Sequence, residues 1–208
     1  MSINTKKTKE MVISFQKVPP NIPQIQVDGA ILERVNCVTL LGVRITNSLT
    51  WGPHVNHIVK KAQSRLFLLT QLRRSKMTSK DIVKIYSTKI RPVLEYASPV
   101  WHGGLTDEQS ISIENIQKRA LRIAYPDYDY DTAMDYAKLS SLYSRRVNHC
   151  KSLFDKMQNP GDKLNRILPK VKDITHSTRK SYKYELPKVN TDRYKNSFLP
   201  YVLFNCQS

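Results

Sequence analysis

Several residue types are scarce in this sequence of 208 residues, and each scarcity excludes a class of protein. Its three cysteines, Cys37, Cys150 and Cys206, are far apart and form no CxxC pair, so neither a disulfide framework nor a zinc site is indicated. The six glycines form no glycine-rich phosphate loop. No apolar run approaches the roughly 18 residues that a membrane helix needs, and no signal peptide is recognisable. We therefore expect no transmembrane segment and a location in the cytoplasm or nucleus.

Acidic residues are also scarce. The sequence has 17 Asp and Glu against 34 Lys and Arg, which gives a net charge of +17. Such a charge attracts polyanions, so nucleic acid is the first partner to consider and an acidic protein or membrane surface the second. An alternative stays open, because many basic proteins have no role in binding nucleic acid.

Candidate catalytic and metal-binding groups are few. The sequence has no Asp-Asp pair, and its one acidic cluster is PDYDYD at residues 126–131. Its spacing imitates a calcium loop, but Thr132 stands where that loop needs glycine and Lys138 where it needs glutamate. We expect it instead to cap a short helix. His54 and His57 lack further ligands at a useful spacing and are interpreted as a surface pair. We predict no catalytic residue, no metal and no cofactor.

Hydrophobic periodicity divides the chain into three regions. Residues 1–50 carry short β-rich runs, including MVISF at 11–15 and an Asp-Gly hairpin signal at 28–29. Residues 51–158 have helical periodicity. From residue 159 the pattern fades: PGDKLNRILPK at 160–170 could hold one or two more turns of helix, and the basic stretch after it has no helical period. We therefore predict an α+β chain that is mostly helical, with a small N-terminal antiparallel β region, a thumb-like helical domain and a weakly structured C-terminal extension.

Four amphipathic helices are expected in the central region. They begin near Trp51, Ser79, Thr106 and Tyr143, and each places apolar residues on one face and polar residues on the other. The outward cations are our candidate nucleic-acid contacts. They are Lys60, Arg74, Lys84, Lys89, Arg91, Lys118, Arg119 and Arg122.

Pro92 interrupts the second of these helices. A proline inside a helix removes one backbone hydrogen bond, so we expect the helix to end or kink just before it. The apolar pattern nevertheless continues to residues 103–104, and Leu94, Val100 and Trp101 are expected in the core. A kink would let one helix lie on the core and still follow a curved polyanion.

Two neighbouring arginines of the fourth helix differ in their predicted environment. Arg146 lies within the apolar arc of that helix, whereas Arg145 lies off it. A buried guanidinium needs a partner, and Glu95 is our candidate partner for Arg146.

Aromatic residues alternate with cations in the last region. They include Tyr182, Tyr184, Tyr194, Phe198 and Tyr201. Such aromatics could stack on bases, as in proteins that bind single strands. The alternative, which we favour, is that they anchor the tail onto the helices.

Several segments together resemble one known family. They are KTKEM, LLGVRITNSLTWGPHV, LRRSKM, IRPVLEYASPVWHG, IENIQKRALRIAYP, SRRVNHCKSLF and RYKNSFLPY. These segments look like the post-catalytic half of reverse transcriptases from non-LTR retrotransposons of the jockey type. The resemblance implies an RNA-directed DNA polymerase in which the end of the palm leads into a helical thumb and a C-terminal extension. It also implies RNA or an RNA–DNA hybrid as the partner, held through backbone contacts.

The resemblance implies roles for a few segments only. The KTK segment, with Thr8 and Lys9, resembles the palm motif just after the catalytic aspartates. The segment Leu40 to Ile45 resembles the primer-grip hairpin, and the helices from Trp51 resemble the thumb. The aspartates of the family have no counterpart here, so we expect a non-catalytic fragment that binds nucleic acid. The alternative is a basic helical scaffold that binds an acidic protein or membrane surface.

Overall fold

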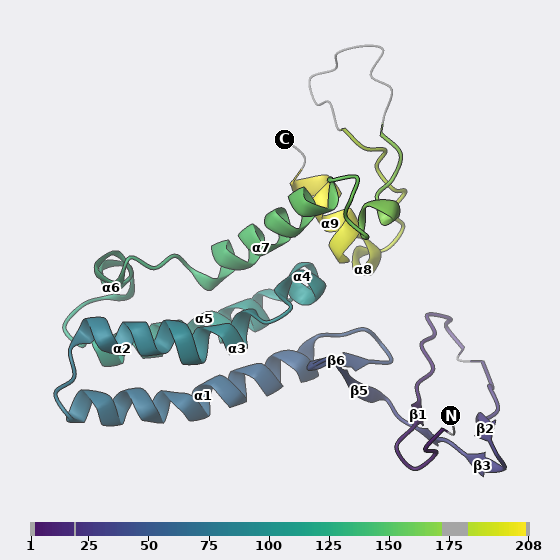
Figure 1. Ribbon diagram of the computed structural model, residues 1–208, viewed down its shortest axis with the longest axis horizontal. Coiled ribbons are helices and arrows are strands. Elements are labelled where there is room, and N and C mark those ends of the chain that lie inside the picture. The colour runs from purple at the N-terminus through teal and green to yellow at the C-terminus, as the bar shows by residue number, and fades with distance from the viewer. Residues whose placement is uncertain (1–2, 19, 172–182, 207–208) are drawn as a thin grey trace. The chain divides into compact units, whose positions relative to one another are not determined.

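The computed structural model describes residues 3–18, 20–171 and 183–206, and it contains many helices and a few short strands (Figure 1). This confirms the predicted α+β class with mostly helical structure. The chain forms two compact units, unit 1 from Met1 to His57 and unit 2 from Ile58 to Ser208. The three-part division at residues 50 and 158 stays a prediction.

Among the residues of unit 1 that the structure describes, short strands form three pairs. They are β1 (Lys9–Glu10) with β4 (Glu33–Arg34) in parallel, and two antiparallel hairpins, β2 (Gln26–Val27) with β3 (Ala30–Ile31) and β5 (Cys37–Leu40) with β6 (Val43–Thr46). The β2–β3 hairpin turns at Asp28 and Gly29, whose φ angles are 50° and 77°. Positive φ at both positions is what an Asp-Gly turn provides, so the hairpin signal is confirmed.

Two further predictions for unit 1 have opposite outcomes. Residues 40–45 do form a hairpin, which turns at Leu41 and Gly42 with φ angles of 48° and 82°. Residues 11–15 were predicted as a strand and are irregular instead. The described part of the chain gives this segment no neighbouring strand to take its backbone hydrogen bonds, and β propensity alone does not make a strand.

His54 is buried, so its interpretation as a surface residue is wrong. Its exposed fraction is 0 %, and its Nδ1 accepts a hydrogen bond of 3.3 Å from the backbone N–H of Arg44. Burial lowers the pKa of His54 to about 4, with smaller contributions from the charges of His57 and Arg44. The partner of this ring is a strand backbone, which no spacing of histidines reveals.

The helices follow the expected order. Their bounds are α1 (Gly52–Arg74), α2 (Ser79–Ile85), η1 (Tyr86–Ile90), α3 (Arg91–Glu95), α4 (Ser98–Trp101), η2 (His102–Gly104), α5 (Asp107–Ala124), α6 (Tyr130–Ala137), α7 (Leu142–Met157), η3 (Asn165–Ile167), α8 (Asp192–Lys195) and α9 (Phe198–Asn205). Thr106 caps α5 in a capping box with Gln109, and Asp129 caps α6 by accepting from the amide of Thr132. Both caps were predicted.

The helix that contains Pro92 continues through the proline. Residues 86–90 widen into a π-helical turn, in which the N–H of Arg91 donates to the carbonyl of Tyr86. The α-helix then resumes, with Pro92 in the first turn of α3. A proline costs least there, because amides of the first turn have no intrahelical partner. The helix therefore does not end before Pro92 but passes into α3 through a π-helical turn.

The prediction for the segment after Pro92 is partly wrong. Leu94 and Trp101 are fully buried, but Val100 is 52 % exposed. Ala97 adopts a left-handed conformation with φ of 51° and separates α3 from α4. The left-handed residue interrupts the helix, so α4 presents its side chains in directions that do not continue the pattern of α2. Val100 therefore does not follow the periodicity that begins at residue 82.

The core of unit 2 receives one apolar face from each long helix. Its fully or nearly fully buried members include Ile58, Ala62, Leu66 and Leu69 of α1, Ile113, Ile116, Ala120 and Leu121 of α5, and Leu142, Cys150, Phe154 and Met157 of α7. The helical faces predicted from periodicity are therefore largely those observed.

Part of the C-terminal region packs on α7. Tyr184 is buried against Phe154, and the half-buried Phe198 and Tyr201 belong to the same cluster. This favours anchoring over base stacking for these three residues, whereas Tyr182 lies outside the described residues. In the described part of this region the chain forms the short helices α8 and α9, and α9 lies in a stretch for which the sequence shows no helical period. That helix is apolar on nearly every side, so it shows no amphipathic period.

Candidate nucleic-acid interface

Seven of the eight predicted contact residues are exposed on the helices of unit 2. They are Lys60 and Arg74 on α1, Lys84 on α2, Lys89 on η1, and Lys118, Arg119 and Arg122 on α5. Their position follows from the local pattern, because the opposite face of each helix carries the core residues.

These seven cations are not neutralised by carboxylates of the described residues. The ion pairs within the described ranges are Lys9–Glu33, Arg34–Glu10, Arg91–Glu95 and Arg145–Glu95. Lys118 lies over the ring of Tyr130, at 5.3 Å from its centroid. A contact of this kind leaves the ammonium charge in place.

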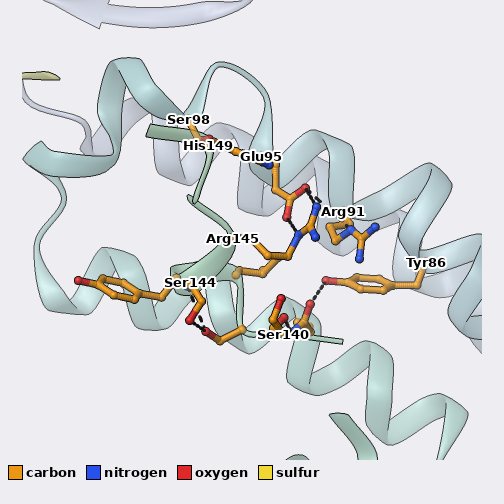
Figure 2. A network of polar contacts seen from close by, with 12 residues as sticks. Tyr86, Arg91, Glu95, Ser98, Ser140, Ser144, Arg145 and His149 are labelled. Carbon is orange, nitrogen blue, oxygen red and sulfur yellow. Dashed lines mark hydrogen bonds and ion pairs between the residues drawn. The ribbon is translucent and has the colours of Figure 1, made fainter. Parts of the chain in front are cut away.

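Arg91 differs from the other seven. Its side chain is 19 % exposed, and its Nε lies 3.9 Å from a carboxylate oxygen of Glu95 (Figure 2). The same carboxylate accepts hydrogen bonds from Nε and Nη2 of Arg145, the second at 3.1 Å. Glu95, with a side chain 10 % exposed, therefore joins α3 to α7 through two guanidinium groups.

The predicted pairing of Glu95 with Arg146 is wrong. Glu95 pairs with Arg145, and Arg146 is fully buried among other partners. Successive residues of a helix point about 100° apart, so only one of two neighbouring arginines can face α3. Arg146 instead donates to Ser110 and His102. Its predicted burial is confirmed, whereas its predicted partner, a carboxylate or a carbonyl, is replaced by a hydroxyl and an imidazole.

The helices that carry the seven exposed cations lie next to one another. The guanidinium of Arg65 on α1 donates to the backbone carbonyl of Lys89 on η1. The hydroxyl of Ser79 on α2 donates to the carbonyl of Ala124 on α5 at 2.6 Å. The run from α2 to α3 thus contacts both α1 and α5 within unit 2 (Figure 1).

Arg65 is an exposed cation that the sequence prediction missed. The structure places it beside Lys89, which was predicted as a contact residue. A signal was present, because Arg65 follows Lys61 by four residues and the two share a helix edge. Arg65 belongs with the seven exposed cations as a candidate contact.

A buried polar network connects the helices that carry the exposed cations. The Tyr86 hydroxyl donates to Oε1 of Gln117 at 3.0 Å, and Nε2 of Gln117 donates to the Tyr130 hydroxyl and the Ser140 carbonyl at 2.9 and 3.1 Å (Figure 2). Burial raises the pKa of Tyr86 and keeps its hydroxyl protonated. The network ties η1 to α5, α6 and the segment between α6 and α7, so it fixes the helices that carry the cations.

The structure contains neither a membrane span nor a metal-binding cluster in the ranges that it describes. No described helix is both long and apolar enough to cross a bilayer. No group of three or more His, Cys, Asp or Glu side chains among those residues could hold a metal ion.

Comparison with known proteins gives one informative match. The chain is 24 % identical over 183 residues to the probable RNA-directed DNA polymerase from transposon BS of Drosophila melanogaster. This chain is similar to a transposon polymerase. The match covers 80 % of this chain but only 20 % of the relative, so the chain spans about a fifth of that protein. No family model and no solved structure match the sequence.

Proposed function

We propose that this chain is a non-catalytic, nucleic-acid-binding part of a jockey-type non-LTR retrotransposon reverse transcriptase. It would comprise the end of the palm, the thumb and a C-terminal extension, and act in the cytoplasm or nucleus. The similarity to a transposon polymerase and the net charge of +17 support this proposal. The observation that carries it is the set of seven exposed cations on adjoining helices without carboxylate partners in the described chain.

The proposed ligand is RNA or an RNA–DNA hybrid. Lysines and arginines on α1, η1 and α5 would contact phosphates, and such contacts position a duplex without reading its sequence. A duplex with an RNA strand also presents 2′-hydroxyl groups in a wide, shallow minor groove, which proteins recognise by shape. We therefore expect affinity that depends on salt and hardly on sequence.

Removing two lysines of the interface should reduce the salt dependence of binding. For duplex DNA, each neutralised phosphate contributes about 0.9 to the slope of log affinity against log salt. The double variant K84Q/K89Q should therefore lower this slope by about 2 units. Filter binding of a duplex to the full chain, repeated over a range of salt concentrations, measures the slope.

Two further variants serve as controls. K151Q/K156Q makes the same charge change at exposed positions of α7 and should alter the slope by less than about one unit. R91Q should leave the slope unchanged, because that guanidinium is paired with Glu95. An equal loss in both double variants would show that net charge alone governs binding. If heparin displaced the hybrid as effectively as nucleic acid of equal charge concentration does, the result would favour the alternative of a basic helical scaffold.

The non-catalytic part of the proposal has a separate test. We expect the full chain to incorporate no nucleotide into a primer annealed to an RNA template, with either Mg²⁺ or Mn²⁺ present. Two-metal phosphoryl transfer needs clustered carboxylates, and the proposed fragment would lack them. Incorporation above a protein-free control would contradict this part and leave the binding result unaffected.

A further inference from the structure

A pocket of about 160 Å³ lies in unit 2, away from the candidate interface residues. Its walls come from η2, the first turns of α5, the start of α7, and α9. The residues that matter here are His102, Gly103, Asp107, Ser110, Tyr143 and Tyr201. Such a volume suits a small ligand group better than a single water molecule, which occupies about 30 Å³ in the liquid.

The C-terminal segment completes this pocket through close packing. A Cβ atom at Gly103 would lie 2.4 Å from the carbonyl oxygen of Asn196 and 3.2 Å from the ring of Tyr201. Only a glycine allows the chain to approach η2 this closely. The absence of a side chain at Gly103 therefore lets Tyr201 reach the wall.

A buried cation lies directly behind the wall. Arg146 is fully buried, and its Nη2 and Nε donate to Ser110 Oγ at 2.8 Å and to His102 Nδ1 at 3.4 Å. Within the described residues its Nη1 has no hydrogen-bond partner, and no carboxylate forms an ion pair with it. The charges of Glu114 and Glu95 compensate this guanidinium only in part, because burial still lowers the pKa of Arg146. Burying a guanidinium without an ion-paired carboxylate is costly, and an anion in the pocket would reduce that cost.

Two chains of hydrogen bonds lead from Arg146 to hydroxyl oxygens of the pocket wall, one directly to Ser110 and one through His102 to Tyr201. An arginine can only donate, so His102 accepts at Nδ1 and carries its proton on Nε2. That Nε2 lies 3.2 Å from the Tyr201 hydroxyl and donates to it. The Ser110 oxygen thus accepts a hydrogen bond from Arg146, and the Tyr201 oxygen accepts one from His102. Both hydroxyl hydrogens are therefore available to donate to a ligand. Burial and the charge of Arg146 lower the pKa of His102 to about 4 and keep it neutral.

We propose that this pocket binds a phosphate group, whose oxygens accept hydrogen bonds from the Ser110 and Tyr201 hydroxyls and whose charge compensates Arg146. The N-terminus of α5, a helix of 18 residues, adds partial positive charge at the same place. The carboxylate of Asp107 in the wall opposes the anion and limits its affinity. This site is independent of the proposed duplex interface, because it uses none of the interface cations.

Removing either hydroxyl should weaken phosphate binding. S110A and Y201F each delete one donor to a charged acceptor, and each should raise the Kd about tenfold or more. Y194F makes the same change at an exposed tyrosine that does not line the pocket, and should leave the Kd within about twofold. D107N should lower the Kd severalfold, because it removes the opposing charge. Isothermal titration of the full chain at constant ionic strength measures each Kd.

Three probes identify the source of the phosphate. They are inorganic phosphate, adenosine 5′-monophosphate and a dinucleotide with one phosphodiester. Binding of the first two that depends on the hydroxyls supports a free or terminal phosphate, and such binding of the dinucleotide supports a backbone phosphate. Equal affinities in the wild type, S110A and Y201F for all three probes would overturn the proposal, as would an equal loss in Y194F. Neither result would alter the salt slope expected for K84Q/K89Q.

Discussion

Replacing Glu95 with glutamine should lower the free energy of unfolding by about 3 kcal/mol. The carboxylate is largely buried and bonds to Arg145 and Arg91, whose side chains are 29 % and 19 % exposed. Glutamine keeps the size of the side chain but removes the negative charge. Two partly buried guanidinium groups would then lack a counter-charge, and breaking one partner of such a pair costs more than the pair contributes.

Urea denaturation of the full chain, followed by circular dichroism, measures this loss. The matched control is E33Q, because Glu33 pairs with Lys9 in unit 1 and the two side chains are 66 % and 36 % exposed. Exposed pairs contribute at most about 1 kcal/mol, so E33Q should stay below that value. If E95Q lost no more stability than E33Q, the joint between α3 and α7 would not depend on this carboxylate.

The sequence predicted most of the helical fold, because helix periodicity and caps are local signals. The buried faces of α1, α5 and α7 and the caps at Thr106 and Asp129 follow from residues within one or two turns. Predictions failed where a contact with another element, or a change of backbone conformation, decides the environment of a residue. His54 is held by the backbone of β6, and the exposure of Val100 follows from the turn at Ala97.

The candidate interface and the pocket differ in how far the sequence could predict them. Exposure of the interface cations follows from each helix alone, and even the ion pair of Arg91 has a local signal in Glu95 four residues later. The pocket joins η2, α5, α7 and α9, whose residues are up to 99 positions apart in its hydrogen bonds. The sequence signal for the pocket is Arg146, which lies within the apolar arc of its helix. That position predicts burial of the guanidinium but does not identify its hydrogen-bond partners.

Replacing Arg146 with methionine should raise the free energy of unfolding by about 1 kcal/mol in a phosphate-free buffer, because removal of the buried charge outweighs the loss of the donor to Ser110 and His102. Methionine has a similar length, fills the same space beside Trp101 and removes a buried charge that lacks a described carboxylate partner. The variant R145M makes the same change one residue earlier, where the arginine does have a carboxylate partner. It should instead lower the stability, because Glu95 would lose its closest cation.

Added phosphate should reverse the order of the wild type and R146M. A ligand that binds only the folded state stabilises it by about 2.7 kcal/mol at a concentration of 100 times its Kd. The wild type should gain this stability, whereas R146M should gain little, because the charge that holds the anion is gone. Urea denaturation in chloride and in phosphate buffer, at equal ionic strength, separates the two effects. A gain in phosphate that is equal for both proteins would mean that the stabilising anion binds elsewhere, and Arg146 would then cost stability without a ligand to compensate it.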